Sequence, residues 1–165
     1  MSFLSKFFDY VSAEERRGIF LPVGPCWEIS GIKDFPLFLK GLSDLVSLGS
    51  VLYLEGGDTP KKLKKYLEER CATNTCKVEM GTVWPHPQCF HMQITYDNLE
   101  GLAKLCESYA LPEVAIHIHV YNDGKMLSMW YDAFYDPLYI SNEISEDKIK
   151  DFCCKLGAKY KQEIA

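Results

Sequence analysis

The sequence predicts an α+β fold: a two-layer sandwich in which an antiparallel, ferredoxin-like sheet of about five strands carries helices on one face, with additional helices towards both ends of the chain. Three observations indicate this fold. Apolar residues alternate with period two in some segments and recur at helical spacing in others, in the order strand, helix, strand, strand, helix, strand, strand. Short turn segments join neighbouring strands directly. The length of 165 residues, with 47% hydrophobic residues, suits one domain with a normal core.

The first part of the chain, residues 1–48, is expected to be a helical extension packed on a single domain that comprises residues 1–165. Apolar residues recur at helical spacing in the first dozen residues and again over residues 34–47, and Gly49 is a typical helix stop. Residues 19–30 lack a clear period and contain two prolines, so they are interpreted as an irregular or short-strand connector.

A regular pattern begins with a predicted strand at residues 51–55, followed by a glycine-containing turn and a helix over residues 60–70. Strands at residues 76–83 and 88–95 flank Trp84-Pro85-His86-Pro87. Because the prolines cannot continue either strand, the two strands are expected to form a hairpin around this segment.

Two further helices are predicted by their capping residues and apolar spacing. Asp97 with Glu100 resembles a capping box that opens a helix over residues 98–109. Ser145 is expected to cap a final helix that ends near residue 160.

A second hairpin is predicted between strands at residues 113–121 and 125–132, because an Asn-Asp-Gly segment joins two alternating runs. With a two-residue turn, the residue numbers of any two paired residues add up to the same sum along the hairpin. The expected register therefore sets His117 opposite Trp130.

Alternation along the strands gives the sheet a second face that is polar, aromatic and titratable, opposite the face that carries the helices. This face suits a flat organic ligand, a protein partner or a second copy of the chain in a homodimer. The candidate ligand-binding residues are Tyr53, Glu55, His91, Gln93, His117, His119, Trp130 and Asp132.

A metal site is the alternative for the same face. His117 and His119 lie on one side of a strand at a spacing that can share a metal ion. In a ferredoxin-like order the strand of Glu55 lies between their strand and that of His91, so Glu55 is the nearer third ligand. This two-histidine, one-carboxylate set would hold a divalent transition metal and support a metal-dependent hydrolase or a related enzyme. Otherwise the histidines only stack on neighbouring aromatic rings.

Residues 130–137 (WYDAFYDP) are the densest aromatic and acidic stretch of the chain. They follow a predicted strand and lead into a loop, which is the usual location of a recognition surface. The alternative is that these aromatic rings cover one end of the core.

No nucleophile elbow and no phosphate-binding glycine motif occurs in the chain, and Cys89 beside His91 lies in no known nucleophile motif. The favoured hypothesis is therefore a binding or interaction domain that uses the polar sheet face together with the segment at 130–136. No organic cofactor is expected, and whether the protein is an enzyme stays open.

Charge and cysteine content restrict the partners. The net charge of −5 disfavours nucleic acid and anionic lipid. Four lysines at residues 61–65 indicate either a solvated helix face or an anion-facing surface. Seven scattered cysteines exclude a complete disulfide framework by parity. With no signal peptide or membrane span in the sequence, a cytoplasmic protein with reduced thiols is expected.

Overall fold

Residues 11–164 are described by the computed structural model, and they contain one antiparallel sheet of seven strands together with six helices. The strands are β1 (Cys26–Ser30), β2 (Val51–Gly56), β3 (Gln88–Gln93), β4 (His117–Asn122), β5 (Lys125–Trp130), β6 (Leu138–Ser141) and β7 (Lys159–Glu163). The helices are α2 (Ala13–Arg16), α3 (Phe35–Leu45), α4 (Lys61–Glu68), α5 (Tyr96–Cys106), α6 (Leu111–Val114) and α7 (Glu146–Leu156). Most of the short helix expected in the first dozen residues lies outside this range.

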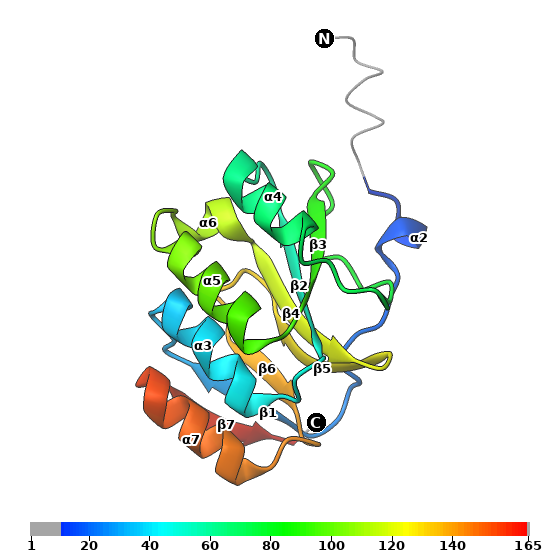
Figure 1. Ribbon diagram of the computed structural model, residues 1–165. Coiled ribbons are helices and arrows are strands. Elements are labelled where there is room, and N and C mark those ends of the chain that lie inside the picture. The colour runs from blue at the N-terminus through cyan, green and yellow to red at the C-terminus, as the bar shows by residue number, and fades with distance from the viewer. Residues whose placement is uncertain (1–10, 165) are drawn as a thin grey trace.

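The sheet has the order β3-β2-β4-β5-β6-β1-β7, and α3, α5 and α7 pack side by side on one of its faces (Figure 1). These helices are amphipathic, and their apolar sides form the main core with the strands beneath them. Phe38 and Phe152 meet there edge to face, with ring centroids 6.0 Å apart. At the start of α3 the Asp34 side chain accepts the Leu37 N–H at 2.8 Å, as an N-cap does.

The prediction of about five strands in a ferredoxin-like order is wrong in two respects. β2 lies between β3 and β4 as predicted, but residues 76–83 form no strand beside β3. Val78 makes only an isolated parallel bridge with Ile19. On the other side, β6, β1 and β7 continue the sheet beyond the second hairpin, so the segment at residues 1–48 contributes β1 to the sheet itself.

Two helix boundaries also differ from the sequence prediction. The side chain of Thr95, not that of Asp97, caps α5, because Thr95 accepts the Asn98 N–H at 3.1 Å. The last helix ends at Leu156, since Gly157 adopts a left-handed conformation with φ 63°. The residues after this stop are then free to pair with β1 as β7.

A β-bulge changes the register of the second hairpin. Next to the turn, Tyr121 pairs with Met126 as predicted. Leu127 has no partner on β4, and beyond it Ile118 pairs with Trp130. The predicted pairing of His117 with Trp130 is therefore wrong by one residue. Because side chains alternate across a strand, the extra residue transfers Trp130 to the helix-covered face.

Candidate functional site

The polar face of the sheet is covered by two segments (the covering segments): residues 12–21, which include the short helix α2, and the irregular residues 71–87. They are joined to each other, because the Ile19 N–H donates to Lys77 O at 2.7 Å and the Glu79 N–H donates to Ile19 O at 2.9 Å. Ile19 and Leu21 pack on a small cluster of sheet residues that includes Tyr53. The face that the alternation pattern places on the surface is therefore an interior layer.

Glu55 anchors the covering segment at 71–87 to β2. Its side chain is fully buried, at 0% exposure. One carboxylate oxygen accepts the Thr82 N–H at 2.6 Å, and the other accepts the Tyr53 hydroxyl at 2.9 Å and the Gly81 N–H at 3.3 Å. His117 Nε2 lies 4.0 Å from the first oxygen. These donors replace the water that the buried carboxylate has lost.

Gly81 is the point of closest approach between this covering segment and the sheet. A Cβ atom at this position would lie 2.5 Å from His117 Nε2 and 2.9 Å from the ring of Tyr131. Both distances are shorter than real Cβ contacts, so glycine is needed for the backbone to reach Glu55.

The two histidines of β4 are fixed by backbone donors. His117 Nδ1 accepts the Asp132 N–H at 3.0 Å, and His119 Nδ1 accepts the Trp130 N–H at 3.1 Å. In each neutral ring the proton consequently resides on Nε2. Burial, with the nearby His117 ring as a smaller cause, lowers the pKa of His119 to about 3, so this ring is neutral at physiological pH.

This arrangement does not fit the expected metal site of His117, His119 and Glu55. A metal ligand offers a nitrogen lone pair, whereas Nδ1 of each histidine already accepts a hydrogen bond and Nε2 bears the proton. Within residues 11–164, no group of three histidine, cysteine, aspartate or glutamate side chains is arranged to hold a metal ion.

The remaining sequence-predicted site residues, His91, Gln93, Trp130 and Asp132, lie in four different places. His91 joins the buried layer, with Nδ1 2.9 Å from the Tyr121 hydroxyl, and burial lowers the pKa of this histidine. Gln93 lies at the end of β3 and donates to a backbone carbonyl. Trp130 lies on the opposite face at 2% exposure, and Asp132 is exposed at the end of β5.

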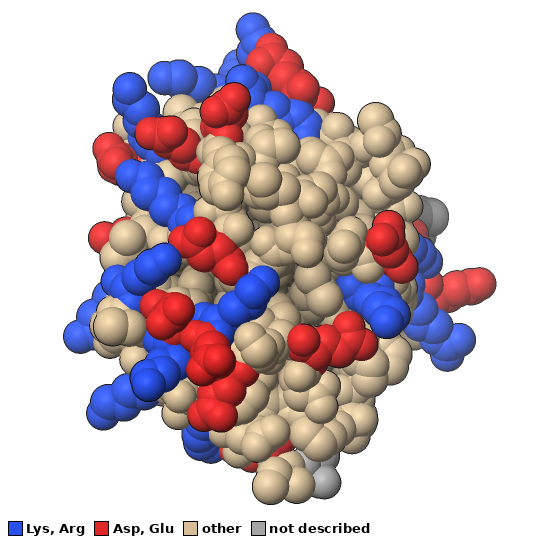
Figure 2. Space-filling view, turned by 60° about the horizontal axis from the view of Figure 1, so that its bottom comes forward, with Lys and Arg blue, Asp and Glu red and all other residues tan. Residues whose placement is uncertain are grey.

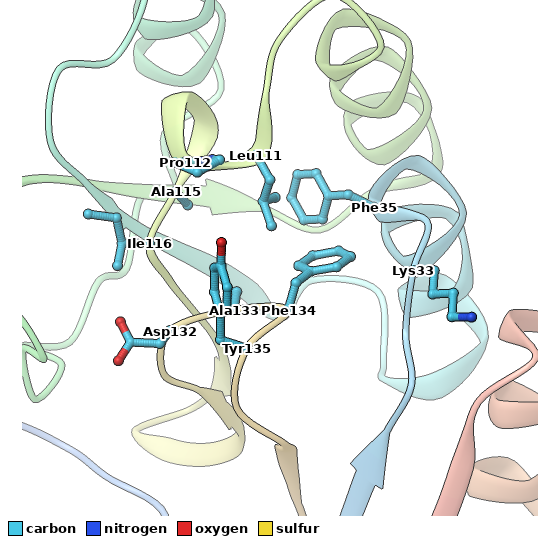
Figure 3. Close-up of a pocket in the computed structure, with 10 residues that line it drawn as sticks. All are labelled: Lys33, Phe35, Leu111, Pro112, Ala115, Ile116, Asp132, Ala133, Phe134 and Tyr135. Atoms are coloured by element: carbon cyan, nitrogen blue, oxygen red, sulfur yellow. The ribbon is translucent and has the colours of Figure 1, made fainter.

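A pocket of about 520 Å³ opens next to Asp132, at the end of the sheet. Its apolar wall combines residues from the start of α3, from α6 and the loop that follows it, and from the turn after β5 (Figure 3). The apolar residues that line it include Phe35, Leu111, Ala115, Ile116, Phe134 and Tyr135. Of all the lining residues, only the run from Asp132 to Tyr135 belongs to the aromatic stretch that the sequence indicates as a recognition surface.

The turn at residues 132–136 holds two non-glycine residues in left-handed backbone conformations, Asp132 at φ 39° and Phe134 at φ 75°. The Tyr135 N–H donates to Asp132 O at 2.9 Å, and the Trp130 indole N–H donates to Asp136 O at 2.8 Å. The Phe134 ring stacks on Trp130 with a centroid distance of 4.6 Å. These contacts hold the turn in a conformation that an isolated chain would rarely adopt.

His117 connects the pocket with the buried polar layer. Its Nδ1 accepts the Asp132 N–H at the edge of the pocket, and its Nε2 lies 4.0 Å from Glu55. Of the candidate residues of the polar face, His117 therefore supports the pocket from behind, whereas Asp132 lines the pocket itself.

The lysine cluster of residues 61–65 lies on α4 and is partly neutralised. Lys64 and Lys65 are 3.9 and 3.8 Å from Glu68 and Glu69, one helical turn further on. On the face displayed in Figure 2, basic side chains likewise lie among acidic ones. This mixture of signs gives no broad basic surface on that face.

Comparison with known proteins gives no family for this chain, because no protein-family model, curated protein or solved structure matches it. Within residues 11–164, no helix is both long and apolar enough to span a membrane. The chemistry that the chain can perform has to be inferred from its own cavities and side chains.

Proposed function

We propose that this chain is a binding domain that takes a small organic ligand in the pocket beside residues 132–135. The volume of about 520 Å³ lies within the usual range of ligand pockets, roughly 300–1,000 Å³. The wall is mostly apolar and aromatic, which provides binding energy for an apolar body. No reaction is part of this proposal.

The observation that carries the proposal is the strained turn. A phenylalanine at φ 75° costs about 1–3 kcal/mol, and such conformations concentrate at ligand clamps and binding sites. Here the strain puts Phe134 against Phe35, with ring centroids 6.0 Å apart, and leaves Tyr135 89% exposed at the edge of the pocket. A wall that is held rigid before binding loses little entropy when a ligand arrives.

Indole is a suitable probe, because it is flat, aromatic and uncharged. In a titration of ¹⁵N-labelled protein, we expect the amide signals of residues 132–136 to shift and those of β7 to stay unchanged. Tyr135→Ala should weaken indole binding at least about threefold, as the loss of one aromatic contact predicts.

Tyr96→Ala is the matched control, because Tyr96 is also an exposed tyrosine but lies on α5, outside the pocket lining. This variant should bind indole like the unmodified protein. The proposal fails if indole shifts no signal of the turn, or if both variants bind equally well.

A further inference from the structure

We propose that a second site, the furrow between α4 and α5, binds a small molecule that carries two or more phosphate groups. This furrow shares no lining residue with the pocket beside residues 132–135, so the inference does not depend on the function proposed above. It is carried by three features: the contact that forms the furrow, the basic side chains along it, and the fixed guanidinium group of Arg70.

The furrow forms where a tyrosine of α4 lies on a glycine of α5. The Tyr66 hydroxyl donates to Asn98 O at 3.0 Å, and a Cβ atom at Gly101 would collide with that hydroxyl. Along this contact opens a hollow of about 580 Å³. Its volume lies within the usual range of ligand sites, roughly 300–1,000 Å³, and exceeds what a single phosphate ion would fill.

Basic side chains predominate along the furrow, although the chain as a whole has a net charge of −5. Lys62, Lys65 and Arg70 line it from the side of α4, and Lys104 lines it from the side of α5. The only carboxylate in the lining is that of Glu69, which lies 3.8 Å from the Lys65 ammonium and 3.4 Å from the Arg70 guanidinium. One carboxylate shared in this way leaves a local excess of positive charge.

Two of these cations have no carboxylate partner within residues 11–164. Lys62 and Lys104 form no ion pair there, whereas Lys64, which does not line the furrow, lies 3.9 Å from Glu68. The lysines that face the furrow from its two sides are therefore available to an anion.

Arg70 is already ordered for binding a phosphate group. Its guanidinium carbon lies 3.8 Å from the centroid of the Tyr66 ring, and Nη1 donates to Tyr66 O at 3.3 Å. Nη1 also donates to Glu69, whereas Nε and Nη2 donate to no group within residues 11–164. The edge of a guanidinium presents two parallel N–H groups that match two phosphate oxygens. Because the side chain is held in place, it loses little freedom on binding.

Charge also sets the size of the ligand. Two phosphate groups carry about three to four negative charges, which suits the four basic side chains of the furrow. A long polyanion such as nucleic acid would extend from the furrow over a molecule of net negative charge, and this repulsion would weaken its binding.

Pyrophosphate is the probe, because it joins two phosphate groups and has no organic part. Added to ¹⁵N-labelled protein without a divalent metal, it should shift the amide signals of residues 66–70 and 104–108 and leave those of residues 132–136 unchanged. Sulfate at the same ionic strength has fewer charges to pair, so it should bind at least about fivefold more weakly.

Substitutions assign the contacts. Arg70→Gln should weaken pyrophosphate binding about tenfold, because it removes a pair of charge-assisted hydrogen bonds, and Arg70→Lys should recover only part of this loss. Lys104→Gln should weaken binding about two- to fivefold. Lys64→Gln is the matched control, because Lys64 also lies on α4 but outside the furrow, and this variant should bind like the unmodified protein.

Three results would overturn the inference. Equal affinities for sulfate and pyrophosphate, or equal losses in Lys64→Gln and Lys104→Gln, would indicate unspecific attraction to surface lysines. Tighter binding of a short DNA duplex than of pyrophosphate at the same salt concentration would exclude a small molecule as the ligand. None of these results bears on the pocket beside residues 132–135, which the indole titration tests separately.

Discussion

The two faces of the sheet are covered by different means. On one face, α3, α5 and α7 bury an apolar surface, and the contacts are side chain against side chain. On the other face, the covering segments lie over a layer of histidine, tyrosine and glutamate, and the decisive contacts run from Glu55 to backbone N–H groups. Apolar packing under the helices tolerates small shifts of side chains, whereas the attachment of the covering segments depends on individual hydrogen bonds.

The largest expected effect comes from removing the carboxylate of Glu55. Glu55→Ala leaves the N–H groups of Gly81 and Thr82 and the hydroxyl of Tyr53 without their acceptor. Each unpaired buried donor costs about 1–3 kcal/mol, so the three losses together should cost at least about 3 kcal/mol. Phe152→Ala, on the helix-covered face, should cost a similar amount by leaving a cavity. Urea denaturation measures both losses.

Hydrogen exchange distinguishes these two variants. Glu55→Ala should raise the exchange rate of amides in residues 71–87 far more than that of amides in α5. Phe152→Ala should raise exchange in the helices at least as much as in the covering segments. If the two variants gave the same pattern, the two faces would not differ in the way described.

A smaller effect is expected at Gly81. Gly81→Ala puts a methyl group against His117, whose ring is held by its bond to the Asp132 N–H, so the overpacking should cost about 3 kcal/mol. Gly57→Ala is the matched control, since a Cβ at Gly57 meets no atom within 4 Å. A thermal melt in which both variants behave alike would show that the covering segment can move away from the sheet at little cost.

The smallest effect is a dependence of stability on pH. A histidine whose pKa is lower in the folded state than its unfolded value of about 6.5 binds fewer protons when folded, so stability falls as the pH drops below that value. With the pKa of His119 at about 3 and that of His91 also lowered, the loss from His119 alone at pH 5 is about 2 kcal/mol.

His119→Asn isolates this contribution. Asparagine keeps an acceptor for the Trp130 N–H but has no proton to gain, so urea midpoints at pH 7 and pH 5 should lie closer together in the variant. Groups that face His119 include His117, Tyr53 and Tyr131. Burial raises the pKa of Tyr131 to about 12 and that of Tyr53 further, so neither hydroxyl titrates in this range.

The sequence predicted the elements whose apolar residues repeat clearly, and it failed where tertiary contacts decide. β2, β4 and β5 and the helices α3, α4, α5 and α7 lie where periodicity indicates, within a few residues. β6 has only four residues, and β7 alternates charged with uncharged residues at an edge. Neither has a local pattern strong enough to be recognised without its partner strand.

The site was predicted only in part, for a related reason. The polar residues of β2 and β4 do gather, but alternation cannot tell a solvent-exposed face from one that a covering segment occupies. The pocket needs Phe35 and Leu111, which lie 76 residues apart in the sequence and share no motif. Only the aromatic stretch at 130–137 gave a local signal for it.

The unpaired Leu127 has an effect that reaches beyond its own position. Beyond this bulge, the side chains of β5 point to the opposite faces from those that a regular hairpin would give. Trp130 therefore points to the helices, and its indole N–H can donate to Asp136 O. Without this extra residue, the strand would deliver the following turn to the other side of the sheet. A single inserted or deleted residue in a strand, with the pocket residues themselves unchanged, would thus decide whether the pocket exists at all.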